Sequence, residues 1–432
     1  MTAEPRLRSA RSAPVQPGAP PDLGLLRLPG FWVVAVLLAV GAVRMSMIAG
    51  RYAAAYPIAL LTATGLFALL AVPFWFVVSE LDFLEREPLG LRVLAFGWGG
   101  LVATAVSIPA SAALDDLIAK LGSPHLAADW GAALAGPTVE EIAKTLGVVA
   151  IVLVARAQVN SVLDGVVYGA LVGLGFQIVE DVVYAMGAVA LAGRGDHVEP
   201  VITTFLLRGL LSGLWSHTLF GALAGAGIGY LVVRCERTLR TRVGVAMLGV
   251  LGAWASHVLW NSPLLRDGLG NGAVALLAVL VLKGLPPLVL IWLLVRSAHD
   301  READYYAEQL ATLDDPELIT PAEAEALKSG SRRASARSHA RVRAGFRARA
   351  AVRRLQRAQA RLAVELSRGT QDLGRWCREV RRQRRILNRL GHPEAIAPAG
   401  KGPWRRTASA VFSTALAVAV LWAAVSTLVG GG

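Results

Sequence analysis

The sequence predicts an all-α fold, a polytopic transmembrane helical bundle of about nine spans with a cytoplasmic, basic helical insertion before the last span. Of its 432 residues, 54% are hydrophobic and only 17% are charged, whereas soluble domains carry about 25% charged residues. Long apolar runs recur along the chain, each close to the roughly 20 residues that a bilayer core requires. Arginines gather in alternate connections, as the positive-inside rule describes. Together these observations predict a multi-pass membrane protein.

Nine apolar runs are long enough to be spans. They are residues 31–49, 57–79, 91–113, 131–155, 161–192, 203–234, 243–262, 273–296 and 407–428. The fifth and sixth runs are longer than one span needs, which predicts tilt or a kink. No small-residue cleavage site follows the first run, so we expect a retained anchor and not a cleaved signal peptide.

The connections between the spans divide into two sets by charge. With the basic leader inside, one set is cytoplasmic, and its arginines include Arg86, Arg92, Arg156, Arg234, Arg237, Arg240 and Arg242. The opposite connections, of which "ALDDLIAKLGSPHLAAD" is the longest, are mixed or acidic in charge. We expect these to be outward loops.

Composition divides the chain into four parts. Residues 1–28 are a Pro- and Arg-rich leader that we expect to be disordered, and residues 29–298 hold the transmembrane core. Residues 299–406 are first acidic and then Arg-rich, with apolar residues at helical intervals, and residues 407–428 form the last span. We expect the basic part to lie against anionic lipid headgroups or against itself, with a solvated spacer as the alternative. It has no aromatic stacking platform, so we expect no nucleic-acid partner.

The fourth span carries three charges in the stretch "PTVEEIAKTLGV". Ionisable residues inside a membrane are costly and face a protein interior or a wet cavity, so they indicate a functional site. Glu140 and Lys144 are four residues apart and share one helical face, and Glu141 lies about 100° around the helix. A purely structural ion pair is the alternative interpretation.

Three other spans carry polar side chains at a similar depth. Glu180 lies in the fifth span and His217 in the sixth, and His257 lies one turn before Asn261 in the seventh. Counted from the cytoplasmic helix ends at about 1.5 Å per residue, Glu140 and these side chains lie roughly 20 to 30 Å from the inner face. We therefore expect one shared site in the outer half of the bilayer.

For some residues near this group we expect a role in folding and not in catalysis. His217 is followed at four-residue steps by three glycines that end at Gly229, which predicts close helix packing. Asp164 is placed to cap the fifth helix, and Arg208 to neutralise a buried carboxylate.

The chemistry of this group suits hydrolysis. A buried carboxylate near a cation can deprotonate water, and histidine and asparagine donors can stabilise the resulting oxyanion. Alternatively, His217, His257 and Glu180 could bind a divalent metal such as zinc that activates the water. The residues alone leave both mechanisms open. No Gly-x-Ser-x-Gly elbow lies at this level, which argues against serine catalysis.

Four motifs in order resemble the PrsW family of bacterial intramembrane proteases, which is distantly similar to the CAAX prenyl endopeptidase superfamily. They lie within residues 130–262 and are "EEIAK", "DGVVYGALVGLGFQIVED", "SHTLFGALAGAGIG" and "HVLWN". The resemblance implies a multi-pass protein of the bacterial plasma membrane. It also implies site-1 cleavage of a membrane-anchored anti-sigma factor, a single-pass substrate, on the extracytoplasmic side.

The same resemblance implies roles for individual residues. Glu140 and Glu141 would be the water-activating pair with Lys144 as their partner, and Glu180, His217, His257 and Asn261 would complete the site. Prenyl endopeptidases usually have an arginine four residues after the second glutamate and a histidine where Glu180 stands. This chain differs at both places, which argues against CAAX substrates. The family is labelled metalloprotease, whereas its wider relatives suggest a metal-free glutamate mechanism.

Three other functions remain as alternatives. A secondary transporter would also carry buried carboxylates at mid-membrane depth, although no inverted repeat relates the two halves of this chain. A CAAX-type prenyl endopeptidase or a membrane scaffold is the further alternative.

Overall fold

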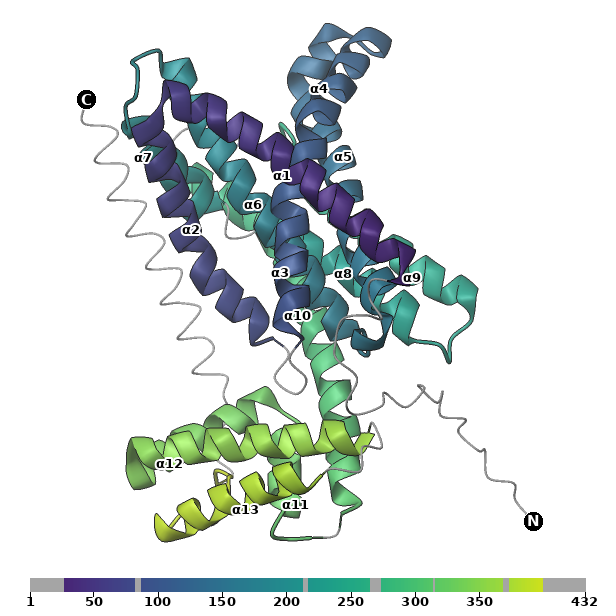
Figure 1. The fold of residues 1–432 in the computed structure, drawn as a ribbon, viewed down its shortest axis with the longest axis vertical. Helices are drawn as coiled ribbons and strands as arrows, with labels where there is room; N and C mark the ends of the chain where they lie inside the picture. Colours follow the sequence, from purple (N-terminus) through teal and green to yellow (C-terminus); the bar gives the residue numbers. More distant parts are fainter. Residues whose placement is uncertain are drawn as a thin grey trace.

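We describe a computed structural model, in which the described residues are 27–81, 87–212, 217–264, 273–313, 315–367 and 373–398. The predicted last span, residues 407–428, and almost all of the predicted leader lie outside the described residues. Every regular element in the described part is a helix, as predicted (Figure 1). The helices of the larger bundle are α1 Pro29–Ala55, α2 Pro57–Ser79, α3 Leu89–Gly97, the π-helical η2 Trp98–Ala103, α4 Thr104–Leu121, α5 Pro124–Ala155, the 3-10 turn η3 Arg156–Gln158, α6 Val162–Ala192, α7 Glu199–Thr204, the π-helical η4 Phe205–Ser212, α8 His217–Val233, α9 Leu239–Asn261 and α10 Ala273–Ala311.

Six helices in the described part are long and apolar enough to cross a membrane. They are Pro29–Ala55, Pro57–Ser79, Leu89–Leu121, Val162–Ala192, Leu239–Asn261 and Val281–Ala311. The predicted count of nine is therefore not confirmed. The helix α5 is long enough but carries three charges at its centre, and the predicted span 203–234 is divided into α7, η4 and α8.

The prediction of a loop between the third and fourth spans is wrong, because this stretch is helical. The helix α4 continues to Leu121 and α5 begins at Pro124, so that only Gly122 and Ser123 connect them. The hydroxyl of Ser123 accepts a hydrogen bond from the Leu126 amide at 3.0 Å, and a proline follows it at the first helical position, which is a strong helix start. The polar residues of this stretch lie on a helical hairpin that projects beyond its neighbours (Figure 1).

The helix α6 is the centre of the bundle. In its most apolar window 89% of the residues are buried, against 11% for α1, as expected for a helix that is apolar on all sides. It packs on α8 through glycines: a Cβ added to Gly169 would clash with the Gly221 carbonyl, and one on Gly173 with the His217 carbonyl. The predicted close packing below His217 is confirmed.

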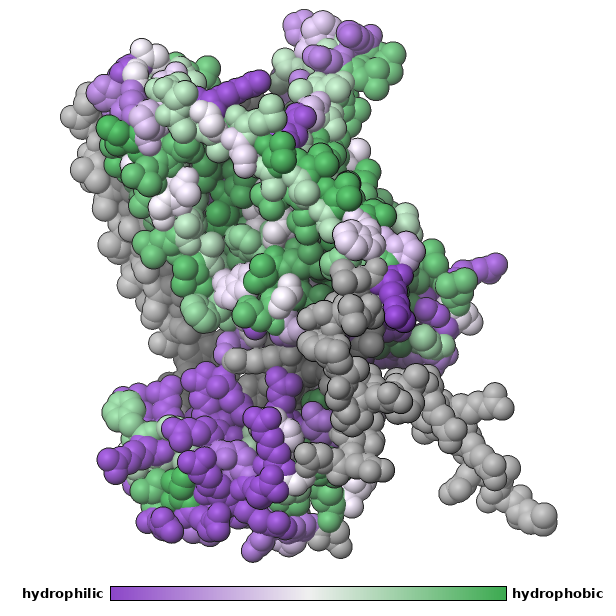
Figure 2. Space-filling view, in the orientation of Figure 1, coloured by the Kyte–Doolittle hydropathy of each residue, from purple (hydrophilic) through white to green (hydrophobic). Residues whose placement is uncertain are grey.

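The chain after the bundle forms a second helical unit with its own apolar core. Its helices are the end of α10, α11 Pro321–Leu327, α12 Gly330–Ser367 and α13 Gly374–Arg389. Figure 2 shows this hydrophilic unit at the end of the hydrophobic bundle opposite the α4–α5 hairpin. Arg357 and Arg353 of α12 lie 3.2 and 3.8 Å from Glu80, at the end of α2.

Candidate active site

Glu141 and Lys144 form a buried ion pair at the centre of α5. Both residues are 1% exposed. The Lys144 ammonium donates a hydrogen bond of 2.6 Å to Glu141 Oε1 and lies 4.6 Å from the centre of the Phe176 ring. Because an unpaired charge at this depth would be very costly, each residue requires the other.

His217 is held between two charged groups. Its Nδ1 lies 2.9 Å from the Lys144 ammonium and its Nε2 lies 3.0 Å from Glu180 Oε2. An ammonium can only donate, so Nδ1 accepts and Nε2 carries the proton that is donated to Glu180. These contacts fix both the orientation and the tautomer of the ring.

His257 is fixed in a similar way from α9. Its Nδ1 lies 2.8 Å from Glu141 Oε1, and its Nε2 lies 3.2 Å from the Asn261 amide nitrogen, one helical turn further. The amide of Asn261 also donates to the Ala132 carbonyl at 3.3 Å. The two imidazoles are therefore adjacent, with ring centres 4.9 Å apart.

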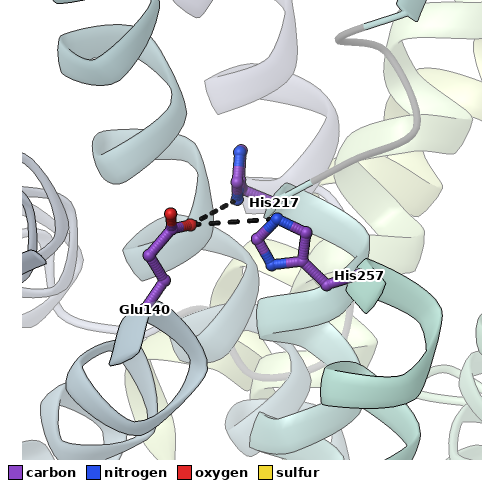
Figure 3. Close-up of side chains that lie close together, drawn as sticks. All are labelled: Glu140, His217 and His257. Carbon is purple, nitrogen blue, oxygen red and sulfur yellow. Dashed lines mark ion pairs between the residues drawn. The ribbon is translucent and has the colours of Figure 1, made fainter. Parts of the chain in front are cut away.

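Glu140 is the carboxylate that faces both rings (Figure 3). Its Oε2 lies 3.8 Å from the Lys144 ammonium, 3.8 Å from His217 Nδ1 and 3.9 Å from His257 Nε2. This oxygen is buried and has no hydrogen-bond partner in the described chain. Buried polar atoms are rarely left without a partner, so Glu140 Oε2 is available to a water molecule, a substrate or a metal ion.

Glu140, His217 and His257 could bind a metal ion, since each offers a ligand atom and all three atoms lie within 4.8 Å of one another. Two imidazoles and one carboxylate form a donor set that is typical of catalytic zinc. Lys144 opposes such binding, because its ammonium already contacts His217 Nδ1. The group therefore fits a metal ion if the Lys144 side chain turns away from His217. Glu180, predicted as a metal ligand, instead accepts from His217 and is not part of this group.

Arg208 adds a cation to the site from η4. Its guanidinium donates to Asp181 Oδ1 and to Glu180 Oε2, both at 2.8 Å, and lies 3.7 Å from the centre of the Tyr184 ring. The sequence indicated that Arg208 neutralises a carboxylate but not which one. The π-helical turn around it changes the direction of side chains relative to an α-helix, and such turns are common at functional sites.

Asp164 lies away from this centre. It forms a capping box with Ser161 at the start of α6, as predicted. All seven residues predicted for the site, Glu140, Glu141, Lys144, Glu180, His217, His257 and Asn261, are joined by the contacts above.

A cavity of about 410 Å³ opens onto these side chains. Glu140, Glu180, His217, His257 and Asn261 lie in its wall. Small residues of α5 and the outer half of α4 form much of the remaining wall. This cavity gives a polypeptide or water access to groups that are otherwise buried.

The fold and this site define a class of protein: a multi-pass membrane protein whose helical bundle contains a group of side chains suited to hydrolysis. The family model described as PrsW family intramembrane metalloprotease matches residues 87–291, a range that contains every residue of the site. Over these residues the chain is similar to PrsW-family intramembrane proteases, and the protein is an intramembrane peptidase. No curated protein and no solved structure matches the chain significantly.

Proposed function

We propose that the protein cleaves a peptide bond of a single-pass membrane protein near the extracytoplasmic face of the bacterial plasma membrane. One observation carries this proposal: Glu140 Oε2 is buried, has no hydrogen-bond partner in the described chain and lies 3.8 and 3.9 Å from two oriented imidazoles at the wall of an open cavity. We take the α11–α13 unit to be cytoplasmic. Counted at about 1.5 Å per residue, the site residues then lie about 23 to 27 Å from the cytoplasmic ends of their helices.

In this mechanism Glu140 takes a proton from the attacking water. His257 Nε2 accepts a hydrogen bond from that water when the Asn261 amide turns away from it, while His217 stays bonded to Lys144 and Glu180 and forms the adjacent wall. The Asn261 amide, whose bond to Ala132 is long at 3.3 Å, can turn to donate to the oxyanion. The proton held by Glu140 is then delivered to the leaving amine.

In a second form of the mechanism Glu140, His217 and His257 would hold a zinc ion, and Glu140 would then be a metal ligand in place of the free base. When bound, it would act as a Lewis acid toward the scissile carbonyl and the attacking water. If this second form holds, elemental analysis of the purified protein should find about one zinc per chain, which His257→Ala should remove. Full activity of a preparation with no detectable metal would instead assign water activation to Glu140 alone.

For the substrate we propose a membrane-anchored anti-sigma factor, as the resemblance to PrsW proteases implies. Comparative proteomics of membranes with wild-type protein or Glu140→Gln should reveal one single-pass protein that accumulates uncut in the variant. We expect Glu140→Gln to lower its cleavage by about 100-fold or more, since it removes the general base. Glu199→Gln is the matched control, because Glu199 pairs only with exposed Arg194 in the described chain.

The ends of the wild-type fragments test the side of attack. Ends that map to the extracytoplasmic half of the substrate's span support the proposal. Equal cleavage by wild type and Glu140→Gln, or a cut in the cytoplasmic half, would contradict it.

A further inference from the structure

Asp115 is a second carboxylate in the wall of the cavity. It lies on the outer part of α4, in the hairpin that the sequence suggested to be a loop, and it lines the cavity together with Ser111, one turn further inward. Asp115 Oδ1 and Ser111 Oγ are both shielded from solvent and have no hydrogen-bond partner in the described chain. These two atoms lie one turn apart on the same face of α4, and both are available to hydrogen-bond a ligand.

The space for this carboxylate depends on a glycine of the facing helix. A Cβ added to Gly131 on α5 would clash with the carboxylate of Asp115. The absence of a side chain at position 131 therefore lets Asp115 lie against α5 beside the cavity. This close approach places the carboxylate at a defined level of α5.

The charge of the cavity favours a cation at this level. Four carboxylates line it, those of Asp115, Glu140, Glu180 and Asp181, and Arg208 is the one Lys or Arg residue among its lining residues. Arg208 binds Glu180 and Asp181, and no ion pair among the described residues includes Asp115. A positively charged group beside Asp115 would offset part of this negative charge and pair with the one of these carboxylates that has no cation near it.

The distance between Asp115 and Glu140 can be bounded along α5. A Cβ on Gly136 would lie 3.1 Å from Glu140 Oε1, so the Glu140 carboxylate lies beside Gly136. In the same way, the Asp115 carboxylate lies beside Gly131. The helix rises about 7.5 Å from Gly131 to Gly136 and about 13.5 Å to Glu140. An extended chain advances about 3.3 Å per residue, so this separation corresponds to about two to four residues.

We propose that Asp115 is a specificity-determining residue that pairs with a lysine or arginine of the substrate, about two to four residues outward of the cleaved bond. Ser111 bonds the backbone of the same extended segment. The inference rests on the proposed peptidase function and names the chemistry of the substrate segment that the cavity receives.

Reporter substrates test this pairing in proteoliposomes. Each reporter is an Ala/Leu transmembrane helix followed by a Gly/Ser-rich outer segment with Lys, Gln or Glu at one scanned position. Wild-type protein should cleave the best Lys reporter about tenfold or more faster than its Glu counterpart, as expected for a close charge pair. Asp115→Lys should reverse that order, and Asp115→Asn should remove the preference while the Gln reporter is still cut.

Asp116→Lys is the matched control, since Asp116 is exposed, adjacent in sequence and absent from the cavity wall. It should keep the wild-type order of reporters. Equal cleavage of Lys and Glu reporters by wild type, or an unchanged order in both Asp115 variants, would overturn the role of Asp115 and leave the peptidase intact. Cleavage of no reporter by wild type would contradict the proposed function and this inference with it.

Discussion

Lys144 connects the two halves of the candidate active site. Its ammonium contacts Glu141 at 2.6 Å and His217 at 2.9 Å, and Glu141 in turn holds His257 at 2.8 Å. One buried cation thus sets the orientation of both imidazoles. The three charges of α5 are tolerated in a bundle core because each contacts a group of opposite charge or a hydrogen-bond partner.

Arg208 allows a test of this electrostatic balance. We expect Arg208→Met to lower the free energy of unfolding by more than the roughly 1 kcal/mol of a surface ion pair, because it leaves Asp181, whose side chain is 2% exposed, without its cation. Thermal or denaturant unfolding in detergent would measure the change. Adding Asp181→Asn should recover part of the loss, since it removes the orphaned charge.

The control for Arg208 is Arg194→Met. Arg194 pairs with Glu199 on the surface, where both side chains are more than 70% exposed, and such pairs contribute about 0 to 1 kcal/mol. Equal losses at the two positions would show that Glu180 and Asp181 do not depend on Arg208 more than a surface pair depends on its partner.

At the scale of elements, the contact between α6 and α8 positions His217. The glycines of α6 bring the two backbones together, and Gly173 lies against the carbonyl of His217 itself. The same contact brings His217 within 5.0 Å of Phe176, measured between ring centres. Packing of small residues therefore acts directly on the geometry of the site.

We expect Gly173→Ala to displace the start of α8 and to reduce cleavage by about tenfold or more, since misplacement by about 1 Å can cost 100-fold. Gly187→Ala on the same helix is the control, because nothing lies within 4 Å of an added Cβ there. It should retain activity and gain slightly in stability, as alanine favours helix over glycine. A fully active Gly173→Ala protein would argue against this positioning role.

At the scale of the whole molecule, the α11–α13 unit lies under the end of α2. The pKa of Arg337 is lowered by burial and by the positive charges of three nearby arginines, Arg353, Arg349 and Arg357. The helix α12 is kinked at Ala344 and Gly345, and beside this kink Val342 and Phe346 are 84% and 68% exposed. Exposed apolar side chains among arginines are typical of segments that bind anionic membrane surfaces.

We propose that this face of α12 contacts anionic headgroups. Hydrogen exchange of the full protein in nanodiscs should show stronger protection around Phe346 with anionic lipid than with neutral lipid. The double change Arg349→Glu and Arg353→Glu should abolish the difference. Arg378→Glu with Arg382→Glu, on exposed positions of α13, is the control, and protection that is independent of lipid charge would contradict the proposal.

Much of this protein was already determined by its sequence. Apolar runs of span length fixed the helical bundle, and helical spacing put Glu140 and Lys144 on one face. Counting residues from the helix ends brought Glu180, His217 and His257 to the level of Glu140, because each residue adds a constant rise along a helix. The resemblance to PrsW proteases, confirmed over residues 87–291, rests on the same motifs.

Only the tertiary structure decided which groups meet. The rotation of each helix about its axis, set by glycine packing and by the π-helical turns, determines that Arg208 pairs with Glu180 and Asp181 and that Glu140 keeps an unpartnered oxygen. The tertiary structure also shows that the expected loop is a helical hairpin, and that this hairpin places Asp115 in the cavity wall. The residue count gives the height of a side chain along its own helix and the helical period gives its face, whereas its partners depend on contacts between distant parts of the chain.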